Sequence, residues 1–276
     1  MGSDQASYAF DNALAVQRAR LRVLEATLDA GTFRHLEAIG VRPRWRCLEV
    51  GTGGGSVAAW LAERVGPGGE VLATDLDVTV ARERVHPAVT LQVHDLRADP
   101  LPEGHFDLVH ARLLVAWLSE RHRVLQRLVR SLVPGGWLLV EELDFVSVVA
   151  AGNGESADLD VFARVFDAHL AVLQDRHGFD PFYGRRLTAD LAAAGCEAID
   201  CEGRAAVWRG GGDGMHLWRL TFEQLRAAMI AAGLPAADID RAVELCDDPA
   251  VAFIAPLAMA AWGRRPALSR DLRAGH

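Results

Sequence analysis

The sequence predicts an α/β protein in which a mostly parallel sheet alternates with helices. An apolar run at Cys47–Val50 ends in a glycine turn, and an amphipathic segment follows at Ser56–Val65. Strand-like and helix-like segments then alternate as far as Asp144. Strand, glycine loop and helix in this order bring a nucleotide-like ligand against bare backbone. Half of the 276 residues are apolar, which is enough for one sizeable core.

The glycine turn has the spacing G-x-G-x-G, formed by Gly51, Gly53 and Gly55. The dinucleotide fingerprint G-x-G-x-x-G/A requires Gly or Ala at the position where this chain has Ser56. The loop therefore suits an adenosyl ligand without a pyrophosphate better than it suits NAD.

Four further strands are expected after the loop: Glu70–Asp75, Val89–Val93, Phe106–His110 and Trp137–Val140. A helix is expected at Arg121–Leu132, and Pro134-Gly135-Gly136 leads from it into the last of these strands. Asp75 ends the second strand, where a βαβ unit places an acid beside ribose hydroxyls. His94-Asp95-Leu96 follows the third strand, and Glu141-Glu142-Leu143-Asp144 follows the fifth.

These motifs, in this order, resemble the class I S-adenosylmethionine-dependent methyltransferases. LEVGTGGGS is similar to the family's first motif and ATDLD to its second, HDLRADPLPEGHFDLV is similar to the third and fourth, and LVPGGWLLVEE to the motif at the fifth strand. The resemblance covers residues 40–145 in detail. It implies a Rossmann-like seven-stranded sheet of order 3-2-1-4-5-7-6 with an antiparallel last strand. It also implies S-adenosylmethionine as the cofactor, with S-adenosylhomocysteine as its product.

The resemblance also assigns donor contacts to individual residues. The loop would pass the methionine part of the donor, Glu49 would lie beneath it near the ammonium, and Asp75 would accept hydrogen bonds from the ribose. Asp95 would accept from the adenine amino group. Carboxylates are favoured there because the donor is cationic and because ribose diols bind carboxylates bidentately. The full implied set is Glu49, Gly51, Thr52, Gly53, Gly55, Ser56, Asp75, Leu76, Asp95, Leu96, His110 and Ala111.

Structural roles remain open for three of these acids. Glu49 is also explained as a buried acid satisfied by backbone amides, and Asp75 as a turn residue. Asp95 is also explained as a cap for the next turn.

Methyl transfer from a sulfonium requires mainly proximity and alignment, and a general base assists when the acceptor is a hydroxyl or an acidic carbon. The candidate catalytic residues are His110, His169 and Glu142. His110 follows the fourth strand at the end that would face the methyl group. His169 lies on the apolar stripe of a helix, so a core histidine is the alternative. Glu141 and Glu142 alternate in direction, so one of them faces the cleft.

At two places the sequence differs from its relatives, and there the catalytic roles known in those relatives are not assigned to this chain. Ala116 and Trp117 stand where many relatives have a polar pair with a histidine. This leaves open a protein that binds the donor without methylating, or a lyase-like enzyme on the same fold. Metal-dependent relatives have an aspartate where this chain has His110, and we therefore expect no metal.

We expect one domain over residues 1–276, with an N-terminal helical lid at 1–40 and a donor-binding core at 41–145. Insertions at 150–184 and 211–248 would cap the substrate, and their aromatic content predicts a largely apolar pocket. The remaining elements are helices at 11–30, 32–39, 157–176, 185–194, 214–232 and 236–246 and strands at 197–207 and 251–262. Tyr8 and Phe10 either cover the bound donor or act as packing anchors.

The net charge is −8 and basic residues form no run, which argues against a nucleic-acid partner. Four cysteines without paired spacing, and an N-terminus without a signal pattern, favour the cytoplasm. No apolar stretch is long enough for a membrane span. Together these features predict methylation of a small, largely apolar metabolite, most readily at oxygen, in specialised metabolism. A homodimer is expected by analogy with related lids.

Overall fold

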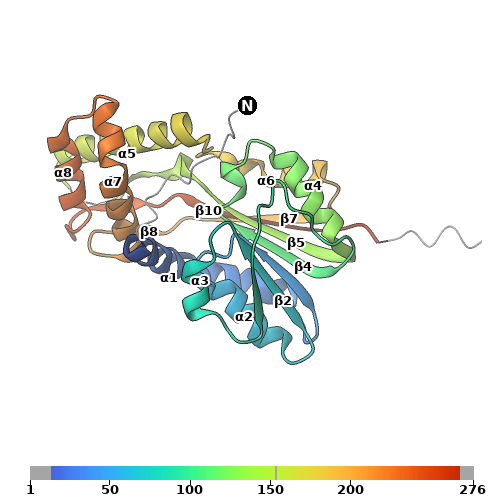
Figure 1. The fold of residues 1–276 in the computed structure, drawn as a ribbon. Coiled ribbons are helices and arrows are strands. Elements are labelled where there is room, and N and C mark those ends of the chain that lie inside the picture. Colours follow the sequence, from blue (N-terminus) through green and yellow to red (C-terminus); the bar gives the residue numbers. More distant parts are fainter. Residues whose placement is uncertain (1–13, 153, 268–276) are drawn as a thin grey trace, which may run out of the picture.

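The computed structural model describes residues 14–152 and 154–267 (Figure 1). Its main sheet has seven strands in the order β3-β2-β1-β4-β5-β10-β7. The pairs among the first five strands are parallel, whereas β10 is antiparallel to both of its neighbours. This confirms the predicted order. The strands are β1 (Arg46–Val50), β2 (Glu70–Asp75), β3 (Val89–Val93), β4 (Phe106–Arg112), β5 (Leu132–Asp144), β7 (Glu197–Arg204) and β10 (Leu257–Arg264).

Helices cover both faces of this sheet (Figure 1). On one face, the apolar side of α2 (Ser56–Val65) packs on β1 and β2, and Leu36 of the N-terminal helix joins the same cluster. On the other face, α4 (Arg121–Ser131) packs against β5, whereas α6 (Leu187–Ala193) packs against β10 and β7. A short helix, α3 (Thr79–Arg84), follows β2.

A second, helical layer lies beyond the carboxyl end of β5. It contains α5 (Ser156–His177), α7 (Asp213–Ala231) and α8 (Ala236–Leu245), which gather at one end of the molecule (Figure 1). A small sheet of order β6-β9-β8 lies with them, formed by Val149–Ala150, Ala252–Ile254 and Val207–Arg209. Sequence analysis did not predict this sheet.

The N-terminal helix was wrongly divided at Gly31. The structure has one helix, α1 (Leu14–Ile39), that runs through this glycine. A glycine inside a helix costs about 1 kcal/mol relative to alanine, and the contacts of both halves of α1 offset this cost. A Cβ atom at Gly31 would be in ordinary contact with the guanidinium of Arg204, at 3.4 Å. Tyr8 and Phe10 lie outside the described residues.

The expected strands at 197–207 and 251–262 were also wrong, because each divides between two sheets. β7 ends at Arg204 and Val207 begins β8, while β9 and β10 are separated by Ala255 and Pro256. Proline lacks the N–H that a continuous ladder requires. The backbone N–H of Ala255 instead donates to the carbonyl of Ala206 at 2.8 Å. This hydrogen bond links the segment between β9 and β10 to the segment between β7 and β8.

Three single-turn helices also depart from the predicted boundaries. They are η1 (Val115–Trp117), η2 (Phe145–Ser147) and η3 (Tyr183–Arg186). The helix expected at 185–194 therefore begins as a separate turn, η3, before α6. Within the described residues, no helix combines the length and the apolar character needed to cross a bilayer.

The helical layer is held together by an aromatic cluster centred on Phe162, which is 1% exposed. Its ring centroid lies 4.2 Å from that of Phe253 and 5.6 Å from those of Trp218 and Phe222. We expect Phe162→Ala to lower the free energy of unfolding by about 3–5 kcal/mol, measured by urea denaturation.

The control is Phe182→Ala, because Phe182 is 42% exposed and the guanidinium of Arg185 lies over its ring at 5.1 Å. Its loss should cost about 1 kcal/mol or less. Equal costs for the two variants would contradict the central place of Phe162.

Candidate donor and acceptor site

The glycine loop between β1 and α2 needs each of its glycines. Gly51, Gly53 and Gly55 have φ angles of 71°, 54° and 88°, which side chains rarely tolerate. Gly54 differs, since a Cβ atom there would lie 2.1 Å from Oε1 of Glu25 and would displace that side chain. The loop thus presents bare backbone and lies against α1, whose Leu21 and Glu25 approach Gly53 and Gly54.

Asp75 is tied to this loop at the end of β2. One oxygen of its carboxylate accepts from the N–H of Gly53 at 3.0 Å, and the other accepts from the N–H of Asp77 at 3.4 Å. Burial raises the pKa of Asp75, although these backbone hydrogen bonds oppose the shift. Leu76, the next residue, is 57% exposed and offers an apolar surface at the same edge.

Bare loop backbone, a carboxylate and an apolar side chain fit an adenosyl ligand. The donor contacts predicted for Glu49, Thr52, Ser56 and Leu76 stay predictions.

The carboxylate of Asp95 is already paired with a residue two positions further along the chain. Its carboxylate forms an ion pair with the guanidinium of Arg97, with contacts of 2.9 and 2.8 Å, and accepts from the Arg97 N–H at 2.9 Å. The Arg97 guanidinium therefore lowers the pKa of Asp95. A bond to the amide two residues ahead is the turn-capping arrangement that sequence analysis left open. The adenine contacts of Asp95 and Leu96 stay predictions.

A row of charged side chains crosses the face of the sheet that α1 covers. Glu49 and His110 are register partners on β1 and β4, and Nδ1 of His110 lies 2.6 Å from Oε2 of Glu49. Nε2 of His110 lies 3.1 Å from Oε2 of Glu141 on β5. Since both ring nitrogens face carboxylates, both act as donors and the ring is an imidazolium. Burial alone would lower the pKa of His110, but the two carboxylates outweigh it and raise the pKa to about 9.

The row continues from the sheet into α1. Glu141 also accepts from the hydroxyl of Thr32 at 2.5 Å, and its Oε1 lies 2.7 Å from Nδ1 of His35. Nε2 of His35 lies 2.7 Å from Oε2 of Glu202 on β7. Despite burial, these partners hold the pKa of Glu141 well below its usual range and raise the pKa of His35. The lid helix is therefore attached to the sheet by charged hydrogen bonds. We call Glu49, His110, Glu141, His35 and Glu202 the charged row.

Among the three predicted bases, His110 and His169 are in structural positions. His110 is fully buried and uses both nitrogens in the charged row. His169 is buried on α5 among Phe145, Phe166 and Phe222, and its Nδ1 donates to the carbonyl of Phe166. Burial lowers the pKa of His169 to about 4. The geometry therefore favours the alternative of a core histidine for His169.

Glu142 both holds a turn of the backbone and has a shifted pKa. Its Oε1 accepts from the N–H groups of Leu114, Val115 and Ala116 at 2.9, 2.6 and 3.1 Å and so holds the η1 turn. Burial raises the pKa of Glu142 to about 7, and these amide bonds oppose the shift. The residue also lines a cavity, described next.

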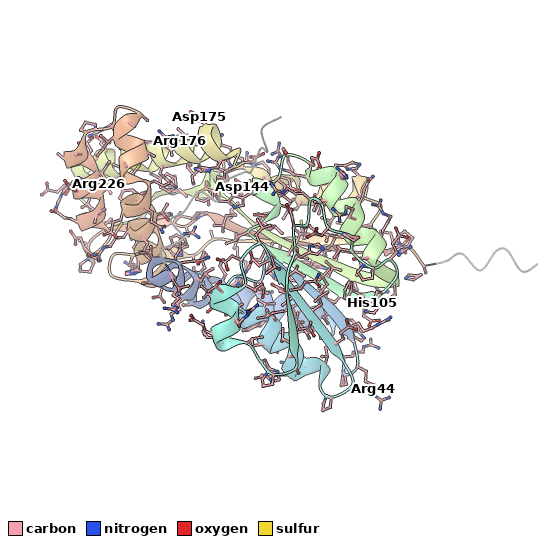
Figure 2. All side chains as sticks on the ribbon, viewed as in Figure 1. Arg44, His105, Asp144, Asp175, Arg176 and Arg226 are labelled. Atoms are coloured by element: carbon pink, nitrogen blue, oxygen red, sulfur yellow. The ribbon has the colours of Figure 1, made fainter. Side chains whose placement is uncertain are left out.

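A cavity of about 130 Å³ lies between α1 and the carboxyl ends of β4 and β5. In Figure 2, Asp144 marks the carboxyl end of β5, and His105 and Arg44 mark the opposite end of the sheet. Most of the cavity wall is apolar; the polar groups that line it include Thr32, His35, Arg112, Glu141 and Glu142.

Sequence analysis missed most of the residues that line this cavity. Among the aromatic residues, Trp208 lies on the cavity wall. Phe162 and Phe222, which belong to the two expected cap insertions, pack inside the helical layer instead. The missed residues come from α1 and from the segment between β7 and β8, such as Thr32 and Ala206. Polar residues on the inner face of a predicted helix were the available signal. Among the described residues, no group of His, Cys, Asp and Glu is arranged to hold a metal ion.

Comparison with known proteins points to the methyltransferases, which agrees with a loop and a carboxylate that fit an adenosyl ligand. Residues 48–140 match a family model described as a methyltransferase domain. Methyltransferase str3 of Strobilurus tenacellus is 32% identical over 149 residues, which cover 54% of this chain and 52% of that protein. The ubiquinone/menaquinone biosynthesis C-methyltransferase UbiE of Laribacter hongkongensis is 34% identical over 117 residues, or 40% of this chain and 48% of that protein. The chain thus matches about half the length of these two relatives.

Solved structures share the fold. BH2331 of Bacillus halodurans C-125 superposes with a TM-score of 0.54 at 20% identity, covering 84% of this chain and 97% of that one. YcgJ of Bacillus subtilis gives a TM-score of 0.54 at 18% identity with the same coverage. The loop, the acid after β2 and the strand order define an α/β protein built to bind an adenosyl group. By the match over residues 48–140 and by these relatives, the chain is similar to the class I S-adenosylmethionine-dependent methyltransferases, whose methyl donor is S-adenosylmethionine.

The charged row makes stability depend on pH. The pKa of His110 is raised from 6.5 to about 9, so its stabilising contribution is complete below about pH 6.5 and is lost as the pH rises through about 9. We expect the difference in unfolding free energy between the wild type and His110→Gln to fall by roughly 3 kcal/mol between pH 6 and pH 10, measured by urea denaturation.

His105→Gln is the matched control, because His105 is partly exposed and pairs with Glu70 at the other end of the sheet. Its difference from the wild type should change much less over the same range, because an exposed ion pair contributes about 1 kcal/mol or less. A difference for His110→Gln that does not change with pH would contradict the imidazolium assignment.

Proposed function

We propose that this chain transfers the methyl group of S-adenosylmethionine to a small, largely apolar metabolite, at an oxygen atom. The observation that carries the proposal is the cavity between α1 and the carboxyl ends of β4 and β5. Arg112 and Leu113 line it, and Ala111, a predicted donor contact, directly precedes them on β4. Its small volume and apolar walls suit an acceptor of the size of a single aromatic ring.

The residues of the chain would act mainly by positioning. Asp75 and the glycine loop would hold the donor, which supplies an activated methyl group when bound. The apolar walls, with Trp208 and Met259, would orient the acceptor and exclude water. Such alignment supplies most of what an in-line displacement requires, because the sulfonium is already a good leaving group.

Glu142 is the best candidate for a general base. It lines the cavity, and burial places its pKa at about 7, within the range in which a carboxylate accepts protons near neutral pH. The η1 amides use one of its oxygens. An acceptor hydroxyl that is itself acidic, such as a phenol or an enol, would need no stronger base.

The relatives support a small-molecule acceptor but leave the methylated atom open. UbiE is by its name a C-methyltransferase of quinone biosynthesis, so transfer to carbon remains an alternative to transfer to oxygen, and nitrogen is a third. A second class of function is a protein that binds the donor without methylating, or a lyase-like enzyme. The pair Ala116 and Trp117 leaves room for this second class, because Trp117, which packs on Phe179 at 4.4 Å, stands where many relatives have a histidine.

Three further parts of the proposal follow from the sequence. The single-domain division, with a lid at 1–40, a core at 41–145 and caps at 150–184 and 211–248, is proposed as the functional organisation. The net charge of −8 supports small-molecule chemistry over nucleic acid, and we propose a cytoplasmic protein that forms a homodimer.

Calorimetric titration tests the donor site directly. We expect micromolar binding of S-adenosylmethionine and S-adenosylhomocysteine and no binding of NADH. Asp75→Ala should abolish adenosyl binding, because it removes the carboxylate predicted to accept from the ribose. A folded wild-type protein that binds neither adenosyl ligand would refute the methyltransferase proposal.

Glu142→Gln tests the base. Glutamine keeps an oxygen for the η1 amides, so donor affinity should remain. We expect the wild-type rate to rise with pH through about 7 and the variant to lose this rise along with about 100-fold or more in kcat. The assay is S-adenosylhomocysteine release with an acceptor found in a screen of phenols, enols and carboxylic acids. An unchanged pH profile would exclude Glu142 as the base.

A further inference from the structure

Glu25 on α1 has a buried carboxylate oxygen that lies against the donor loop. The residue is 8% exposed, and Oε1 has no hydrogen-bond partner within the described part of the chain. The same oxygen would lie 2.1 Å from a Cβ atom at Gly54. An unsatisfied buried carboxylate oxygen is costly, so its retention beside a ligand-binding loop calls for a partner.

The other oxygen of Glu25 fixes the direction of the group. Oε2 accepts from the guanidinium of Arg84 on α3 at 2.8 Å. This contact turns Oε1 toward the loop. The close approach depends on the absence of a side chain at Gly54, since any residue with a Cβ would displace the carboxylate.

The acid beneath the loop is already engaged. Oε2 of Glu49 lies 2.6 Å from the imidazolium of His110, and Glu49 is 2% exposed. A cation arriving from above the loop therefore meets the spare oxygen of Glu25 on the lid helix, whereas the charge of Glu49 is matched from within the sheet.

We propose that Glu25 binds the ammonium of the donor's methionine moiety, so that the lid helix recognises the amino-acid end of the donor. The proposal rests on the donor placement described under Proposed function, in which Asp75 holds the ribose and the loop carries the methionine end. The ammonium supplies the N–H donor that Oε1 lacks. Binding of the donor thereby also fastens α1 onto the loop.

The test compares three ligands that differ at the amino-acid end. S-adenosylhomocysteine has the ammonium and the carboxylate, its desamino analogue has the carboxylate alone, and methylthioadenosine has neither. Calorimetry on the full chain should show wild-type preference for S-adenosylhomocysteine over the desamino analogue of about 10- to 100-fold, as expected for a charged hydrogen bond. In Glu25→Gln this preference should fall to nearly one, with the affinity for methylthioadenosine unchanged.

Glu83→Gln is the matched control, because Glu83 pairs with Arg18 across the same contact of α1 with α3 but lies away from the loop. It should keep the full preference. A Glu25→Gln protein that keeps the preference, or that weakens all three ligands equally, overturns the proposal. So does a preference that is lost in Glu49→Gln and kept in Glu25→Gln. If the folded wild type binds none of the ligands, the donor placement itself fails, which is a separate result.

Discussion

The arrangement of the site depends on the imidazolium of His110 between Glu49 and Glu141. This ion sits in the centre of the sheet at 0% exposure, and neither carboxylate could be buried there without it. Through Glu141 the same charges reach Thr32 and His35 and so fix α1 above the strand ends. Buried charges are costly to leave unpaired, and removing one partner typically costs about 3–5 kcal/mol. The row therefore forms as a unit, and the position of the lid follows from it.

The sequence was sufficient to place β1 to β4 because each is a short, largely apolar run. β5 was predicted too short: it extends over Leu132–Asp144 instead of Trp137–Val140, because strand pairing on both sides continues through residues 134–136 and through Glu141 and Glu142. The order β3-β2-β1-β4-β5-β10-β7 and the helices α2, α4, α5, α7 and α8 were predicted correctly to within a few residues. The failures have tertiary causes. α1 continues through Gly31 because packing outweighs the local preference for a break, and Pro256 divides the last expected strand between two sheets.

The site was less accessible to sequence reasoning than the sheet. The glycine loop and Asp75 follow from local spacing, and the structure brings them into contact at 3.0 Å. On α1, Leu14, Leu21, Leu24 and Leu28 recur at helical spacing, but these side chains are half-buried and the buried ones include Glu25, Thr32 and His35. Their partners, Glu141 and Glu202, are more than a hundred residues away in the chain. A pattern within the helix cannot reveal that its polar side faces inward.

The charge balance of the row explains where a cationic donor finds its counter-charges. Glu49, Glu141 and Glu202 face His110 and His35, and Arg34 contacts Glu202 at the surface, so the carboxylates and the cations are equal in number. Together with Arg34, the charged row is neutral and neither attracts nor repels the sulfonium strongly. The acids available to the donor must then lie outside it. Asp75 and Glu25 both lie outside the charged row and both approach the glycine loop, Asp75 from the sheet and Glu25 from α1. A neutral row that holds the lid, with separate acids left for the ligand, allows the same helix to be both a structural cover and a part of the binding site.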